Sequence, residues 1–171
     1  VEKTIRPLVP NTHMVVTRDL PRNAPLDGTH VSTAGHKILG RRFALAYAER
    51  VLGMPWINGT GPRLVSVTSE SATVVRVTFN KEIKADTNNY GVDLASSLFR
   101  MYDDGVEKTL TSVVRGSDTS TMDITTSSAN SGTVVITYGD RAGEATPIMR
   151  RGVVYDNDDM PAPMFGPIVA E

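Results

Sequence analysis

Cysteine is absent from the 171 residues, so no disulfide framework holds this chain together. The chain also lacks an excess of charge of either sign, because its 18 Lys and Arg nearly balance its 19 Asp and Glu. That balance excludes a protein that binds nucleic acid or a membrane mainly through a basic surface. No apolar run approaches the roughly 20 residues that cross a bilayer, and the first residues lack the order of a signal peptide. We therefore expect a soluble globular protein without nucleic-acid or membrane partners.

The compartment stays open at this stage. A chain without cysteine fits the reducing bacterial cytoplasm, and it fits a released or exported protein equally well.

The hydrophobic pattern changes near Pro62, which predicts two structural parts. In the first part, Thr12–Thr17 is a short β-branched run and predicts a buried strand. From Thr33 the pattern is helical, with Ser32 placed to cap the start and Gly53 placed to end the helix. We expect a strand, a proline-rich loop and a long helix, too little to close a sheet. The apolar residues expected along the buried face of that helix are Ile38, Leu39, Leu45, Ala46 and Leu52.

Beyond Pro62, apolar and polar residues alternate in short runs separated by turn residues, which predicts antiparallel strands. Each such strand needs a facing sheet for its apolar side, so we expect a β-sandwich of immunoglobulin-like or jelly-roll type. The predicted boundaries are residues 1–57, a linker at 58–62 and the sandwich at 63–171. The expected strands are Arg63–Thr68, Thr73–Phe79, Leu98–Asp103, Thr109–Arg115, Thr121–Thr125, Thr133–Tyr138 and Gly152–Asp156.

One segment before the helix has the composition of a catalytic loop. Asp27 stands three residues before His30, with Gly28 between them to allow a tight turn. A carboxylate in that position can orient an imidazole and stabilise its charged form, so that the histidine acts as a general base towards a hydroxyl. The alternative is an exposed loop in which Ser32 simply caps the helix.

The segment Leu26–His36 resembles the last conserved block of the SGNH (GDSL-type) hydrolases, and Asn11–Pro21 looks like the preceding strand and loop of prophage-encoded sialate O-acetylesterases. The resemblance covers Asn11 to Gly53. It implies that Asp27 and His30 are the catalytic Asp and His, on a strand-loop-helix remnant of an α/β hydrolase domain. It also implies O-acetylated sialic acid or another carbohydrate as substrate, and no cofactor.

The nucleophile that this family uses is missing from the chain. No serine stands in a Gly-Asp-Ser-like context, so we expect the serine in an N-terminal hydrolase part that this sequence does not contain. The resemblance therefore predicts the C-terminal portion of a serine esterase, inactive alone, with an accessory β-sandwich. A different class of function also fits: a non-catalytic structural or oligomerising module of a phage or surface protein.

Carbohydrate binding by the sandwich would use exposed aromatic rings, of which the chain has few, at 6% of residues. The candidates are Tyr90, Tyr102 and Tyr155, whereas Trp56 and Tyr138 serve either binding or packing. The three histidines lack converging ligands, so no zinc site is predicted. The aspartates after Tyr155 could hold calcium, but a solvated acidic turn is the expected alternative. Arg41 and Arg42 are expected on a solvated face or in a contact between the two parts.

Overall fold

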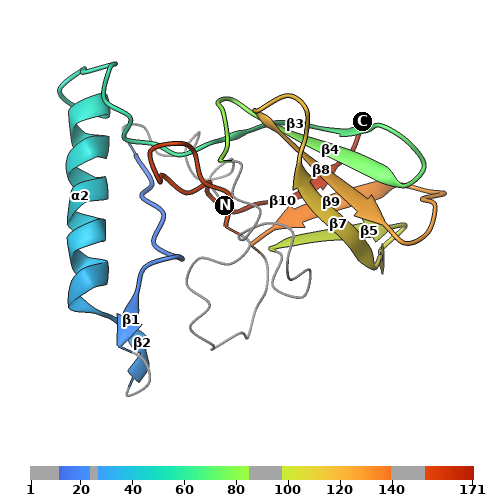
Figure 1. Cartoon of the computed structure of the whole chain (residues 1–171), viewed down its shortest axis with the longest axis horizontal. Coiled ribbons are helices and arrows are strands. Elements are labelled where there is room, and N and C mark those ends of the chain that lie inside the picture. The colour runs from blue at the N-terminus through green and yellow to red at the C-terminus, as the bar shows by residue number, and fades with distance from the viewer. Residues whose placement is uncertain (1–11, 24–26, 85–97, 140–152) are drawn as a thin grey trace.

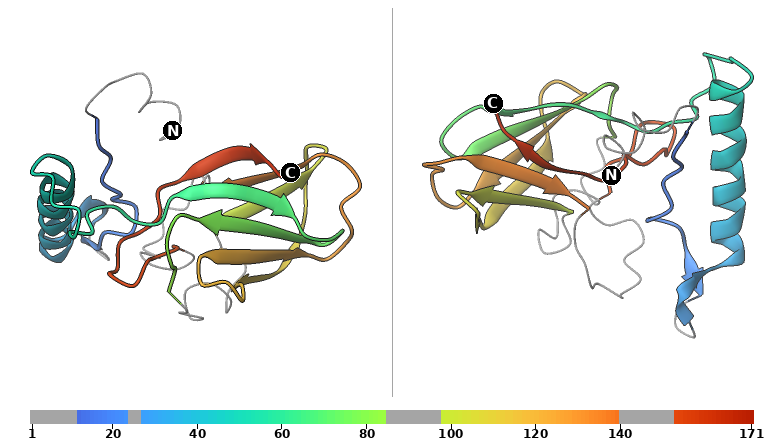
Figure 2. Two further views of the ribbon diagram at one scale, coloured as in Figure 1. Left: turned by 90° about the horizontal axis from the view of Figure 1, so that it is seen from above. Right: turned by 180° about the vertical axis from the view of Figure 1, so that it is seen from behind.

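A computed structural model describes residues 12–23, 27–84, 98–139 and 153–171, and these residues form one long helix, two four-stranded antiparallel sheets and a two-stranded antiparallel sheet. Figures 1 and 2 show the two four-stranded sheets stacked at one end of the molecule and the helix at the other. The expected mainly β fold, an antiparallel sandwich preceded by a helix, is confirmed. The elements are β1 (Arg22–Asn23), β2 (Asp27–Val31), α2 (Thr33–Arg50), β3 (Leu64–Ser69), β4 (Val74–Phe79), β5 (Phe99–Asp103), β6 (Val106–Glu107), β7 (Leu110–Arg115), β8 (Thr121–Thr126), β9 (Val134–Tyr138) and β10 (Phe165–Val169).

The helix α2 begins and ends where the sequence predicts. The Ser32 side chain accepts a hydrogen bond from the backbone N–H of Gly35 at 3.2 Å, which satisfies one of the free donors of the first turn. Gly53 has a φ of +66°, a conformation that glycine adopts without strain, and it turns the chain away after the helix.

One expectation for the first part is wrong, and another holds only in part. Thr12–Thr17 forms no strand, because no described segment pairs with it; a β-branched run stays irregular without a ladder partner. The predicted buried face of α2 is confirmed in part: Ala46 is buried and Ile38, Leu39 and Leu45 are half-buried, whereas Leu52 is 55% exposed. The buried residues of the helix are Gly35, Arg42 and Ala46.

The sandwich follows the predicted alternation closely. One sheet has the order β3-β4-β8-β7 and the other the order β10-β9-β5-β6. Six of the predicted strands are confirmed to within two residues at each end. The strand expected at Gly152–Asp156 is wrong for its described residues, since Tyr155 forms only an isolated bridge with Pro161.

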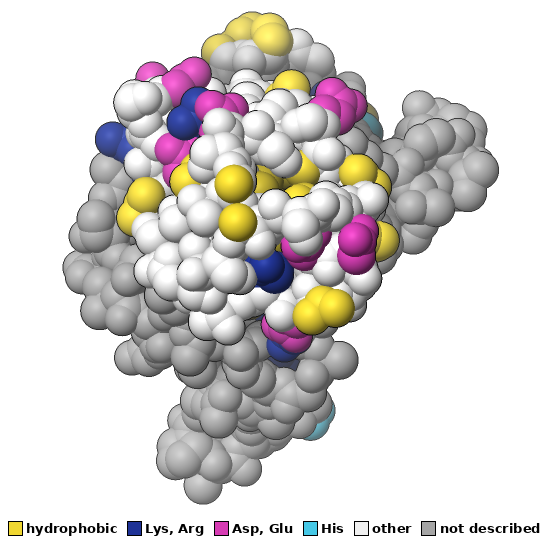
Figure 3. All heavy atoms as spheres, turned by 90° about the vertical axis from the view of Figure 1, so that its right-hand side faces the viewer, with side chains coloured by type: hydrophobic (Ala, Val, Ile, Leu, Met, Phe, Trp, Pro, Cys, Tyr) yellow, Lys and Arg dark blue, Asp and Glu magenta, His cyan; other side chains and the backbone are white. Residues whose placement is uncertain are grey.

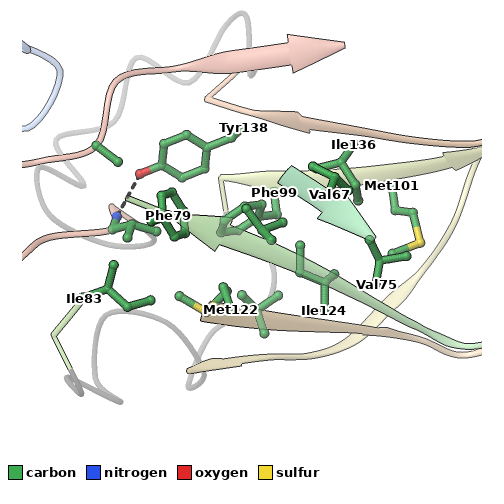
Figure 4. Close-up of a cluster of buried hydrophobic side chains, with 14 of the residues drawn as sticks. Val67, Val75, Phe79, Ile83, Phe99, Met101, Met122, Ile124, Ile136 and Tyr138 are labelled. Atoms are coloured by element: carbon green, nitrogen blue, oxygen red, sulfur yellow. Dashed lines mark hydrogen bonds between the residues drawn. The ribbon is translucent and has the colours of Figure 1, made fainter. Parts of the chain in front are cut away.

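The sandwich core lies between the inward faces of both sheets. Every second residue of β4, namely Val75, Val77 and Phe79, is buried and packs against β5, β8 and β9 (Figure 4). Burying one such side chain contributes about 1.5–3 kcal/mol, so this cluster supplies the main driving force for folding of the sandwich. The Tyr138 hydroxyl accepts a hydrogen bond from the backbone N–H of Val154 at 2.8 Å and so ties a later loop to the core.

The two sheets are joined along one edge by the C-terminus. The backbone N–H of Ser69 donates to the carbonyl of Glu171 at 2.8 Å, and the N–H of Glu171 donates to Val67 at 3.0 Å. These bonds extend from β10 to β3 and cover the edge of β3. The covered edge strand is thereby protected from pairing with another chain.

The turn between β5 and β6 approaches the start of β9 through Asp103. Its carboxylate accepts the backbone N–H groups of Ser131 at 2.9 Å and Gly132 at 2.8 Å, and Lys108 lies 3.6 Å away. The N–H of Ser131 is the largest cause of a pKa for Asp103 below its ordinary value of 3.8, with burial acting in the opposite sense.

Replacing Asp103 by asparagine tests this contribution to stability. Because the folded-state pKa lies below the unfolded one, the ionised carboxylate stabilises the fold above the unfolded pKa, and this stabilisation is lost as pH falls through the folded pKa. We expect Asp103→Asn to lower the melting temperature at about pH 6, and this effect to shrink as the pH falls below 3.8. Thermal unfolding of the variant and the unchanged protein, from about pH 6 downward, measures the difference in melting temperature. A difference that does not change with pH would contradict this account of Asp103.

Candidate functional site

The candidate catalytic residues Asp27 and His30 both lie in β2. This strand pairs antiparallel with β1, with Asn23 opposite Asp27 and Arg22 opposite Val31. The tight turn expected around Gly28 is therefore wrong, because residues 27–31 are extended. The backbone of Asp27 belongs to the strand, whereas its side chain lies outside the described residues. The pairing of Asp27 with His30 therefore stays a prediction.

His30 itself is exposed and stands two residues before the helix cap Ser32. An exposed imidazole at the start of a long helix is accessible to a group that another part of a protein brings to it. In that position it can take a proton from a hydroxyl within hydrogen-bond reach. The structure thus presents the histidine at the surface.

His36, in the first turn of α2, contacts its own helix. Its ring nitrogen Nδ1 lies 3.0 Å from the backbone oxygen of Ser32, one turn earlier in the helix. This local contact fixes the His36 ring against its own helix. His36 is therefore a useful control for a general effect of removing an imidazole from this end of the chain.

The aromatic candidates for sugar binding differ in how far their side chains are exposed. Tyr155 is only 2% exposed, and its hydroxyl donates to Asp19 at 2.7 Å, so its ring is not presented to a sugar and this prediction is corrected. Tyr138 is buried as well, at 1%. Tyr102 is half-buried in β5, and Tyr90 lies outside the described residues. Trp56, at 75% exposed, does not pack the linker against the helix.

A buried ion pair joins α2 to the loop that precedes it and to the sandwich end of the chain. Both terminal nitrogens of Arg42 donate to the Asp19 carboxylate at 2.6 Å, and Arg42 also donates to the carbonyl of Val16 at 2.8 Å. The side chains of Arg42 and Asp19 are 2% and 1% exposed. Tyr155 adds its hydroxyl to the same carboxylate. We call Arg42, Asp19 and Tyr155 the junction triad.

Of the two expectations for Arg42, the junction triad excludes a solvated side chain and agrees with a contact between the two parts. The signal was present in the sequence, since position 42 lies seven residues after Gly35 and four before Ala46, on one helix face. An arginine there must find a partner because an unpaired buried charge is costly.

The predicted linker is packed rather than free. The side-chain amide of Asn58 donates to Asp156 at 2.9 Å and to Asp158 at 2.6 Å. Lys81 donates to the carbonyl of Thr60 at 2.6 Å, and a side chain at Gly61 would overlap the backbone of Pro161. Residues 58–61 therefore lie against the loop that carries the acidic residues.

The acidic loop uses its oxygens within the protein. One carboxylate oxygen of Asp156 accepts the backbone N–H groups of Asp158 and Met160, at 3.0 and 2.9 Å. Across the described ranges, no group of three or more His, Cys, Asp or Glu side chains is placed to hold a metal ion. The helix that the structure describes is neither long nor apolar enough to span a membrane.

A cavity of about 190 Å³ lies apart from His30, between the segment Met14–Arg18 and Pro163–Met164. Its walls are mostly apolar. Arg18, the charged residue on its wall, donates to the carbonyl of Gly139 at 2.7 Å. The catalytic candidates do not line this cavity.

Comparison with known proteins gives only structural likenesses. No protein-family model and no curated protein matches this chain. Among solved structures, the N-terminal part of the bacterial S-layer protein SbsC is similar at 16% identity and a TM-score of 0.45, over 81% of this chain and 28% of that one. The S-layer protein rSbsC(31-844) gives 16% identity and a TM-score of 0.44, over 84% of this chain and 17% of that one.

The structure of SbsC domains 1–6 gives 15% identity and a TM-score of 0.46, over 81% of this chain and 16% of that one. This chain thus spans less than a third of each of these proteins. At TM-scores below 0.5, the likenesses carry no argument about its function.

Proposed function

We propose that this chain is the C-terminal portion of a carbohydrate O-acetylesterase, in which Asp27 and His30 serve a serine supplied by an N-terminal hydrolase part. One observation carries the proposal: an exposed His30 on a short strand that leads directly into the Ser32-capped helix α2. The spacing of Asp27, His30 and the helix start resembles that of the last block of the SGNH hydrolases, although a strand stands where a loop was expected. O-acetylated sialic acid is the substrate that the resemblance suggests.

In the proposed reaction, His30 takes the proton of the serine hydroxyl while the serine oxygen attacks the acetyl carbonyl. The sugar oxygen leaves with that proton and an acetyl-serine remains. Water, deprotonated by the same imidazole, then attacks the acetyl group, and acetate and the free serine are formed. Asp27 acts by holding the imidazole in the required tautomer, which is why the carboxylate is needed although it is not consumed.

The β-sandwich is proposed as an accessory module that binds carbohydrate, with Tyr102 as its described aromatic candidate. A second function, a non-catalytic structural or interaction module, is favoured by a separate observation. The chain contains no serine in a nucleophile context, while α2 carries a row of large exposed apolar residues. A module of this kind would need neither Asp27 nor His30.

Acetate release from O-acetylated sialic acid distinguishes the two functions. We expect the 171-residue chain to hydrolyse the ester no faster than free imidazole, because a general base without a nucleophile has nothing to activate. The longer polypeptide with the proposed N-terminal part is expected to turn over the substrate. Turnover by the isolated chain would show that the nucleophile lies within it. An inactive longer polypeptide would rule out the esterase, and the non-catalytic module would then be the better proposal.

A further inference from the structure

The side of α2 that faces away from the sandwich exposes large apolar side chains. Among the described residues, five of the eleven exposed large hydrophobic side chains fall within residues 43–56. Figures 1 and 2 show α2 at one end of the molecule, with no described element against this side. By contrast, the face at the opposite end shows apolar side chains only in small separate groups among polar atoms (Figure 3).

Three of these side chains form one row along the helix. Phe43, Tyr47 and Val51 are four residues apart and are 57%, 55% and 58% exposed, so they lie above one another on one face. We call them the apolar row. Leu52 at 55% and Trp56 at 75% extend the exposed apolar surface beyond the end of the helix. Contiguous apolar surface of this kind marks an interaction site in a soluble protein.

Next to the apolar row, the surface of the helix carries two small residues, and beyond them two basic residues. Gly40 has no atom within 4 Å of the place where a side chain would begin, and Ala44 follows one turn later. On the far side of these small residues stand Lys37 and Arg41, both exposed and one turn apart. We call Lys37 and Arg41 the basic row.

The charged side chains on this side of α2 are basic. The helix contains a single acidic residue, Glu49, whose side chain is 19% exposed. Glu49 accepts the backbone N–H of Gly59 at 3.1 Å and pairs with Arg50 at 3.3 Å, so its charge is already used within the chain. The basic row therefore has no acidic counterpart on its own helix face.

We propose that this face of α2 binds an acidic amphipathic helix of a partner protein. The partner's backbone would lie over the small residues, its apolar side chains would cover the apolar row, and carboxylates four residues apart would meet the basic row. A second copy of this chain is disfavoured because it would bring two basic rows together. The inference is independent of esterase activity.

Two synthetic helical peptides test the proposal against the intact 171-residue protein. Both carry the same apolar positions, and they differ only in having Glu or Lys at the flanking positions four residues apart. Trp56, the single tryptophan, reports binding through its fluorescence. We expect the Glu peptide to bind about tenfold more tightly than the Lys peptide at low salt, with the difference shrinking as salt is raised.

The variant Arg41→Glu is expected to abolish the preference, because it leaves the basic row with one positive and one negative charge. Tyr47→Ala should weaken binding of both peptides. Thr111→Glu, on the exposed β7 edge of the sandwich, is the matched control and should change neither affinity. Circular dichroism checks that each variant is folded.

Four results would overturn the proposal. In the peptide titration, these are equal affinity for the two peptides and no binding of either. The third is dimerisation of the unsubstituted protein on sedimentation, and the fourth is binding to vesicles of anionic phospholipid in preference to the Glu peptide. The third would assign the face to a second copy, and the fourth would assign it to a lipid surface.

Discussion

Replacing Arg42 by methionine is expected to lower the free energy of unfolding by about 3–5 kcal/mol, the usual cost of breaking a buried ion pair. The substitution leaves the Asp19 carboxylate 1% exposed with only the Tyr155 hydroxyl to stabilise its charge. Methionine is close to arginine in length, so the loss comes from the uncompensated carboxylate and not from a large cavity.

Urea unfolding of Arg42→Met beside Arg41→Met measures this effect with a matched control. Arg41 is the neighbouring arginine on the same helix and is exposed, so its substitution should change stability by less than about 0.5 kcal/mol. The double variant Asp19→Leu with Arg42→Met removes both charges and should recover much of the loss. Similar losses in the free energy of unfolding for the two single arginine variants would show that the buried ion pair of the junction triad does not stabilise the fold.

In the longer polypeptide, replacing His30 by alanine is expected to reduce kcat/KM for acetyl ester hydrolysis by several orders of magnitude. The serine then has no general base, and what remains comes from substrate binding and the oxyanion hole. Asp27→Asn should also reduce kcat strongly, because an amide favours the wrong tautomer of the imidazole. Its effect on KM should be small.

His36→Ala is the control for His30→Ala. His36 lies six residues further along, and its ring contacts the backbone oxygen of Ser32. We expect its removal to lower activity by less than about tenfold. Equal losses for the two histidine variants would mean that the catalytic assignment of His30 is wrong.

The sandwich was predictable because its strands alternate cleanly. In β4, buried and half-buried residues follow each other at every step, as the sequence VVRVTF indicates. β10 could not be found in the same way, because Gly166 and Pro167 occupy its centre and are typical of a turn. Only its pairing with β9 and the bonds from Glu171 to β3 make it a strand.

The first part of the chain was harder to predict, for a physical reason. A strand exists only with a partner, and Thr12–Thr17 has the composition of a strand without any described partner. The buried face of α2 was predicted correctly as far as Ala46, but it was extended to Leu52, which lies beyond the end of the helix at Arg50 and is exposed. Spacing from Gly35 and Ala46 places position 42 on that face, but a hydrophobic pattern gives no weight to an arginine there.

The candidate site was predictable only as a set of residues. Asp27 and His30 follow from spacing and from the resemblance, but their mutual geometry depends on a strand where a turn was expected. Tyr155 illustrates the opposite case: its ring is a good sugar ligand by type, and its partner Asp19 lies 136 residues earlier in the chain. Such a long-range contact leaves no local pattern in the sequence.

Labelling of the longer polypeptide with a fluorophosphonate probe tests the central claim most directly, since the probe reacts only with a serine that a general base has activated. We predict one labelled serine, located outside residues 1–171, with labelling lost in His30→Ala and retained in His36→Ala. Absence of a labelled serine, or labelling that persists without His30, would contradict the assignment of this chain to an esterase.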